Sequence, residues 1–95
     1  MRGREQAGRQ PVLILSHDIF NERSGTVIAM AMTSQEPRAG FPLTLESQAD
    51  GLPKRSWIKI SQIRTLSVDR IGPRLARSSE EELVRVLDGL IEILG

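Results

Sequence analysis

The chain has 95 residues, a formal net charge of +1 at pH 7 and no cysteine. These features predict one domain spanning residues 1–95, with no disulfide framework and no thiolate metal site. No apolar run approaches the ~20 residues that a membrane-spanning helix needs, and the polar, basic start does not resemble a secretory signal. A lone histidine, His17, has no partner for a transition-metal site. We therefore expect a cytoplasmic protein that uses no metal or cofactor and contacts no membrane.

The charge is unevenly distributed along the chain. Residues 1–10 and 52–77 are rich in arginine and lysine, whereas residues 78–95 are rich in acids. Two basic segments and an acidic end can form a phosphate-binding face on a nearly neutral protein, although solvated surfaces would give the same pattern.

Residues 1–10 are predicted to be a polar loop, because they combine glycine with several charged side chains. Loops held against a rigid strand often carry ligand-binding groups, although a frayed, charged terminus is the simpler interpretation. Short apolar or alternating runs downstream predict strands. The predicted strands are 12–15, 26–33, 41–46, 57–60 and 63–68, the last two being either separate or one strand broken near residues 61–62. Turns are predicted at 21–25, 37–40 and 50–53 by composition.

The last segment changes to helical periodicity. Ser79 to Glu82 forms a capping-box pattern. Apolar residues then recur at helical spacing to about Leu94, and Gly95 follows. Short strands followed by one helix predict a mainly β fold, a small, strongly curved, SH3-like antiparallel barrel with the helix packed on it. A domain this small is marginally stable alone, which favours dimerisation.

Polar side chains appear where the second predicted strand ends, at Thr33, Ser34 and Gln35. They are candidates for ligand binding, although a strand-end threonine leading into a turn is also common. His17 lies between Ser16 and Asp18, but adjacent side chains of extended chain point to opposite faces, so these residues are not a catalytic triad.

Several segments resemble the MazF/PemK family of toxin endoribonucleases in order and spacing. The residues that carry the resemblance are Glu5-Gln-Ala-Gly-Arg-Gln-Pro-Val-Leu13, Ser16-His-Asp-Ile-Phe-Asn21, Met32-Thr33-Ser34, Gly40-Phe41-Pro42, Gln62-Ile-Arg-Thr-Leu66 and the final helix. The resemblance spans nearly the whole chain and implies a compact barrel and a homodimer. It also implies metal-independent, sequence-specific cleavage of single-stranded RNA, in which the ribose 2′-hydroxyl attacks the adjacent phosphorus. An antitoxin peptide would block the RNA groove, and toxin and antitoxin would bind DNA together.

The resemblance also implies site residues. Thr33 matches the active-site threonine, and Glu5 matches a loop acid near the scissile bond. The implied catalytic set is Thr33, Arg9, Gln10 and Glu5, and the implied RNA contacts are Arg4, Gln6, Ser34, Gln35, Lys59, Gln62 and Arg64. Lys59 and Ser61 stand where some members carry catalytic Arg and Asp, but Ser61 cannot act as a carboxylate base.

Two departures from the family pattern point to reduced activity. Gln10 replaces the arginine before the proline, which removes a positive charge and a bidentate donor. The usual acidic-aromatic first strand is absent ahead of residues 1–10, which predicts an unpaired sheet edge unless another segment covers it. The alternative function is therefore a truncated or inactive relative that only binds RNA or an antitoxin. A gyrase-directed toxin resembling CcdB is a further alternative.

Overall fold

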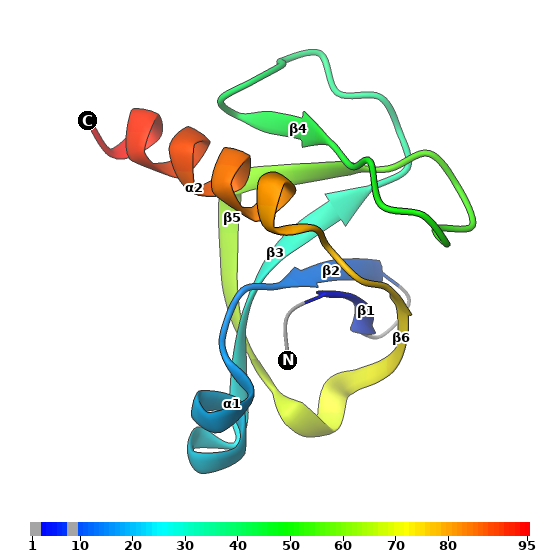
Figure 1. The fold of residues 1–95 in the computed structure, drawn as a ribbon, viewed down its shortest axis with the longest axis vertical. Coiled ribbons are helices and arrows are strands. Elements are labelled where there is room, and N and C mark those ends of the chain that lie inside the picture. Colours follow the sequence, from blue (N-terminus) through cyan, green and yellow to red (C-terminus); the bar gives the residue numbers. More distant parts are fainter. Residues whose placement is uncertain (1–2, 8–9) are drawn as a thin grey trace.

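The computed structural model describes residues 3–7 and 10–95, and describes only the backbone of residues 3–7 and 10. Its main feature is a six-stranded, strongly curved antiparallel sheet with strand order β4-β5-β3-β2-β1-β6 (Figure 1). The strands are β1 (Gly3–Ala7), β2 (Gln10–Ile14), β3 (Thr26–Thr33), β4 (Thr44–Glu46), β5 (Trp57–Ser67) and β6 (Ile71–Ala76). The helices are α1 (Asp18–Ser24), the single turn η1 (Val68–Arg70) and α2 (Glu80–Leu94). The predicted mainly β fold with a C-terminal helix is confirmed.

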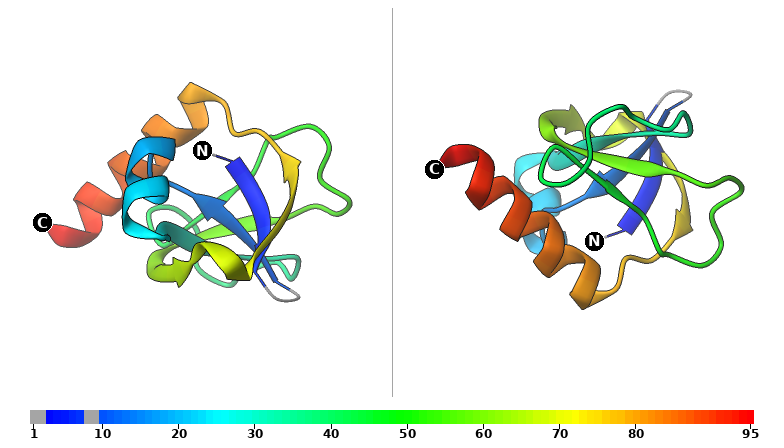
Figure 2. Two further views of the ribbon diagram at one scale, coloured as in Figure 1. Left: turned by 90° about the horizontal axis from the view of Figure 1, so that it is seen from below. Right: turned by 90° about the horizontal axis from the view of Figure 1, so that it is seen from above.

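The sheet separates two apolar clusters, because cross-strand partners share a face and neighbours along a strand do not. On the face covered by α2, the buried cluster comprises Leu13, Met30, Met32, Leu45, Ile58, Ile60 and Val86. On the other face it comprises Val12, Ile14, Val27, Ala29 and Leu66, with Ile71 packed against them. Figure 2 shows α2 along one side of the sheet, and β1 beside β6 on the other. The central strands are therefore buried on both faces, which explains their continuous apolar runs.

Strand β5 bends sharply where its register with β3 breaks. Met30 pairs with Ile63 and Met32 pairs with Ile58. The β5 segment between Ile58 and Ile63 is therefore longer than the β3 segment between Met30 and Met32 that it faces. Residues 59–62 form this bulge, and Figure 1 shows β5 changing direction along its length. The two predicted strands at 57–60 and 63–68 are thus one strand, interrupted near residues 61–62 as the second alternative anticipated. Bulges bend a strand and redirect its side chains.

The loop predicted for residues 1–10 is wrong for residues 3–7. Gly3–Ala7 forms strand β1, which pairs antiparallel with β2 and, through an irregular register, with β6. β6 was not predicted, since Gly72 and Pro73 are unfavourable in strands. Pairing with neighbours overrides these weak local preferences. The unpaired edge expected beside β2 is therefore covered by β1.

The turn predicted at residues 21–25 is the end of a helix. α1 starts at Asp18 and ends before Gly25, whose φ of 70° is the left-handed conformation that closes helices. Ser16 connects α1 to the sheet, since its hydroxyl donates to the Asn21 side chain and accepts from the Ile28 N–H. The composition correctly located the chain reversal, but it could not indicate the preceding helical turns.

Strand β4 is shorter than predicted, because residues 41–43 form a turn. The carbonyl of Gly40 accepts from the N–H groups of Leu43 and Thr44, and the Phe41–Pro42 peptide bond is cis. The exposed side chains of Phe41 and Leu43 therefore do not lie on a strand face as the alternation predicted.

The terminal helix α2 is confirmed, with the Ser79 hydroxyl accepting from the Glu82 N–H at 3.1 Å. The buried Glu82 carboxylate accepts from the Gln48 N–H and from the Ser78 hydroxyl, both at 2.8 Å, and so connects the helix start to the segment after β4. Only part of the predicted apolar stripe packs on the sheet. A second part, the outer stripe of α2, is exposed and comprises Val84, Leu87, Ile91 and Leu94. Within the described residues, no helix is both long and apolar enough to cross a bilayer.

Candidate functional site

Thr33 ends β3 at the boundary between core and solvent. Its side chain is half-buried, and its hydroxyl accepts a hydrogen bond of 3.1 Å from the Gln35 N–H. That bond uses a lone pair of the oxygen, so the hydroxyl proton can still be donated to a ligand. Ser34 and Gln35 follow directly and are exposed. The three polar residues predicted at this strand end are therefore close to one another on the surface.

The backbone of Gln10 lies at the same end of the sheet as Thr33. β2 and β3 pair antiparallel, with Val12 opposite Ala31 as the outermost pair, so Gln10 and Thr33 both lie two residues beyond this pair, at the same end of the two strands. Adjacent strands are about 4.8 Å apart. Two segments that are far apart in the sequence thus meet at one strand end.

The other N-terminal site candidates can be placed only in part. Arg9 lies outside the described residues, and only the backbone of Arg4, Glu5 and Gln6 is described. These three residues are on β1, with Glu5 opposite both Val12 of β2 and Arg74 of β6. Glu5 is therefore on the strand next to the one that carries Gln10.

The candidates on β5 extend away from Thr33. Thr33 pairs with Trp57 at the start of β5, whereas Arg64 pairs with Ala29, four residues back along β3 or roughly 13 Å at the usual rise per residue. Lys59 is half-buried opposite Thr44, while Gln62 and Arg64 are exposed. These side chains can therefore contact an extended ligand but not a single small group at Thr33.

A cavity of about 250 Å³ opens where the N-terminal end of β2 and the C-terminal end of β3 meet the β4–β5 connection. It is lined by Pro11, Ser34, Leu52, Pro53, Lys54, Ser56 and Leu75. Pro11 and Ser34 are the residues directly after Gln10 and Thr33. Lys54 and Ser56 were not predicted as lining residues, although Lys54 belongs to the basic segment at 52–77.

A second, more polar cavity of about 420 Å³ lies between the β3–β4 connection, β4 and α2. Its lining includes the aromatic residues Trp57 and Phe41 and the charged residues Glu36, Arg38, Glu46 and Arg85. Trp57 links it to the candidate site, because Trp57 is the cross-strand partner of Thr33. Trp57 and Phe41 are isolated aromatic residues in the sequence, so no sequence pattern predicted this cavity.

The Trp57 ring is covered by a charged pair. The Arg55 guanidinium lies 5.0 Å from the ring centroid and donates two hydrogen bonds to Glu46, at 2.5 and 3.1 Å. The hydrogen bond and charge of Arg55 lower the pKa of the Glu46 carboxyl below its ordinary value. Both groups lie at the surface, so this pair orders local side chains rather than stabilising the fold greatly.

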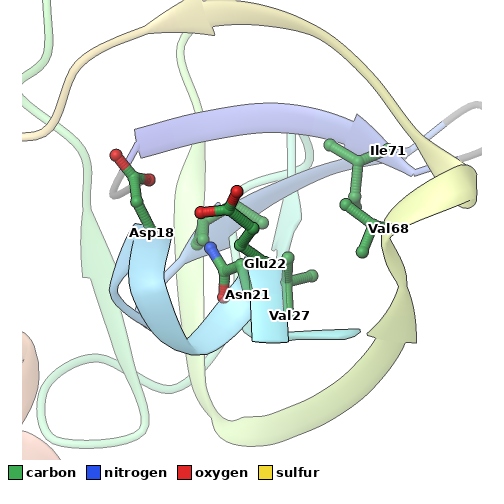
Figure 3. Close-up of a pocket in the computed structure, with 7 residues that line it drawn as sticks. Asp18, Asn21, Glu22, Val27, Val68 and Ile71 are labelled. Atoms are coloured by element: carbon green, nitrogen blue, oxygen red, sulfur yellow. The ribbon is translucent and has the colours of Figure 1, made fainter. Parts of the chain in front are cut away.

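A third cavity, of about 450 Å³, lies far from Thr33, beside the opposite end of β3. Figure 3 shows Val27, Val68 and Ile71 facing it, with Asp18, Asn21 and Glu22 contributed by α1. Its lining is mainly apolar and contains none of the predicted site residues. His17, which precedes α1, is exposed.

The sequence matches the family described as PemK-like, MazF-like toxin of type II toxin-antitoxin system over residues 1–94. Solved structures share the fold. A MazE–MazF crystal structure from Deinococcus radiodurans has 25% identity and a TM-score of 0.82, and the match covers 98% of this chain and 92% of that one. A MazF structure from the same organism has 28% identity and a TM-score of 0.77, over 100% and 84% of the two chains.

A mycobacterial endoribonuclease in complex with its cognate antitoxin has 23% identity and a TM-score of 0.80, over 100% of this chain and 94% of that chain. The fold and the family match define a class, the small toxins of toxin–antitoxin pairs. The chain belongs to the PemK-like, MazF-like family of type II toxins, whose members are endoribonucleases.

Proposed function

We propose that this protein is a metal-independent, sequence-specific endoribonuclease that cleaves single-stranded RNA at the Thr33 end of the sheet. The observation that carries the proposal is the convergence of Gln10 and Thr33 on adjacent strand ends, beside an open cavity. Ser34, Gln35, Lys59, Gln62 and Arg64 extend the surface available to an RNA strand.

The proposed reaction needs no nucleophile from the protein. The 2′-oxygen bonds to the neighbouring phosphorus while the bond from phosphorus to the 5′-oxygen breaks, giving a 2′,3′-cyclic phosphate and a 5′-hydroxyl. A base must accept the 2′-hydroxyl proton, and an acid must protonate the departing oxygen. Among the candidates, Glu5 has the chemistry of a base and Arg9 that of a cation near the leaving group. The Thr33 hydroxyl would donate to a phosphate oxygen whose charge rises in the transition state.

The cleavage test uses a mixed RNA pool in the presence of EDTA. We expect fragments with cyclic-phosphate ends. The cleavage rate should fall by at least about 100-fold in Thr33→Ala, because one preorganised donor to a transition-state charge typically contributes that much. Thr33→Ser keeps the hydroxyl and serves as the matched control. Fragments formed equally by Thr33→Ala would contradict the assignment of this site.

A binding protein without cleavage is the second candidate function, and Gln10 is the observation that favours it. A glutamine can donate hydrogen bonds to a phosphate but brings no positive charge. Tight RNA binding by the purified protein without fragments, even at long incubation, would support this function.

We also propose that the working unit is a homodimer that binds an antitoxin peptide. The outer stripe of α2 exposes four apolar side chains on one helix, with Ile91 and Leu94 65% and 77% exposed. Contiguous exposed apolar patches commonly mark protein interfaces. The similar structures of a MazE–MazF complex and of an endoribonuclease with its cognate antitoxin support an antitoxin partner.

A further inference from the structure

The cavity lined by Trp57 and Phe41 has the composition of a site for an uncharged aromatic group. Its charged lining residues are two glutamates, Glu36 and Glu46, and two arginines, Arg38 and Arg85. A phosphate site would show an excess of cations, whereas here the formal charges cancel. The Trp57 ring is buried beneath Arg55, whereas Phe41 is 45% exposed and offers an open aromatic surface. A nucleobase, which has a flat π-face and a polar edge, would therefore stack on Phe41 and bond to the balanced polar lining.

The cavity also lies at the correct place for a neighbouring nucleotide. Trp57 pairs with Thr33 across β3 and β5, so one strand spacing of about 4.8 Å separates the cavity wall from the Thr33 strand. The turn at residues 40–44 forms another part of the wall, and Thr44 is fixed there by its hydroxyl donating to the Ala39 carbonyl at 2.5 Å. An RNA strand with a phosphate at Thr33 would therefore bring an adjacent base to this opening.

We propose that this cavity is a base-recognition subsite that sets the sequence preference of the RNA at one nucleotide beside the scissile phosphate. The inference rests on the proposed RNA-binding function. Glu36 is the specificity-determining residue. Its carboxylate lies 3.9 Å from the Arg55 guanidinium, an ion pair too long for a hydrogen bond, and its side chain is 70% exposed, so it can still accept hydrogen bonds and favours a base whose edge donates them. Glu46 is already bound by Arg55 and acts by positioning that side chain over Trp57.

The sole tryptophan of the chain makes this subsite directly observable. We would titrate the intact protein with short homopolymeric deoxyoligonucleotides, one for each base, because they lack the attacking 2′-hydroxyl and cannot be cleaved. The expected result is a change in Trp57 fluorescence and a Kd that differs between bases. Glu36→Gln should shift the preferred base and weaken its binding on the order of tenfold, since it replaces an acceptor-only group by a mixed donor and acceptor.

Glu22→Gln on α1 is the matched control, because it makes the same chemical change at an exposed residue of the distant third cavity. It should leave both base preference and affinity unchanged. Trp57→Ala tests the part of the cavity wall beneath Arg55, with Trp57→Phe as the conservative rescue in case the truncation impairs folding of this buried position.

Sequencing the ends of cleaved RNA separates this inference from the proposed function. If Glu36→Gln changes the preference at one base position while cleavage persists, the subsite is supported. If cleavage requires Thr33 but both Glu36→Gln and Trp57→Phe keep the parental base preference, the subsite is overturned and the nuclease stands. If no cleavage occurs but the base-dependent fluorescence change is lost in Glu36→Gln, the subsite stands and the nuclease falls.

Discussion

Gln10 is the difference from the MazF/PemK family pattern that we expect to affect activity most. Its backbone lies at the same strand end as Thr33, where a positive charge would stabilise a pentacovalent phosphate. An amide supplies partial charges only, so the site would bind the ground-state phosphate more easily than it would stabilise the transition state.

We predict that Gln10→Arg raises the RNA cleavage rate by roughly 30- to 1000-fold, corresponding to about 2–4 kcal/mol for one preorganised charged donor. The rate is measured with a fluorescent oligoribonucleotide under single-turnover conditions. Ser67→Arg adds the same charge opposite Thr26, at the other end of β3, and should leave the rate nearly unchanged. An equal gain in both variants would mean that general attraction of RNA, rather than a local contact, is responsible.

A second residue-scale prediction concerns the ion pair over Trp57. Because Arg55 lowers the pKa of Glu46 in the folded protein, the pair is fully formed above the pKa of an unfolded glutamate. It is lost as the pH falls through the lower, folded value. Trp57 fluorescence should therefore be constant down to about pH 4.3, the ordinary pKa of glutamate, and should change only below it. Glu46→Gln should abolish that acid transition, and its persistence in the variant would assign it to another group.

At the scale of elements, the packing of α2 on the sheet depends on a close approach at Gly89. A Cβ atom at this position would lie 2.8 Å from Ile60 Cδ1, 3.1 Å from a ring carbon of Phe41 and 3.2 Å from the Pro42 carbonyl oxygen. Ile60 is fully buried and the Pro42 oxygen belongs to the backbone, so neither can move away freely. The glycine is thus needed for space, although alanine is the better helix former.

We predict that Gly89→Ala lowers the free energy of unfolding by about 1 kcal/mol, because overpacking of about 1–3 kcal/mol exceeds the gain in helix propensity. Urea denaturation followed by circular dichroism measures the change. Gly40→Ala is the control, since a Cβ there meets no atom within 4 Å. A more stable Gly89→Ala variant would show that α2 can move away from β5 without cost.

The elements also show which local patterns are reliable. The helix of residues 80–94 and the strand of residues 26–33 were predicted closely, because long periodic runs and a capping serine specify them locally. Strands β1 and β6 were missed, because their polar, glycine- and proline-containing sequences become strands only by pairing with each other and, for β1, with β2. The bulge at residues 59–62 was detectable as a broken pattern, but its bend was not.

At the scale of the whole molecule, the outer stripe of α2 is the feature that a monomer leaves unexplained. The sheet can cover only one side of the helix, so Leu87, Ile91 and Leu94 remain in solvent. A second copy could bury the same residues symmetrically, as closed two-fold dimers do.

We predict that Ile91→Glu shifts the protein from dimer to monomer, because a buried carboxylate without a partner strongly disfavours the interface. Analytical ultracentrifugation over a range of protein concentrations measures the change. Ile19→Glu places the same charge on α1, where Ile19 is 60% exposed, and should not alter the mass. A wild-type protein that sediments as a monomer at all concentrations would contradict the predicted assembly.

The sequence by itself determined the mainly β class, the terminal helix and the family resemblance, and it singled out Thr33 as a candidate site residue. These depend on local periodicity, on capping and on short motifs, which neighbouring residues encode together. Only the tertiary structure decided that residues 3–7 form a strand, that Gln10 and Thr33 lie at the same end of neighbouring strands, and that Trp57, the cross-strand partner of Thr33, lines a cavity. These features arise from pairing between distant segments, whose register is fixed by burying both faces of one curved sheet at once.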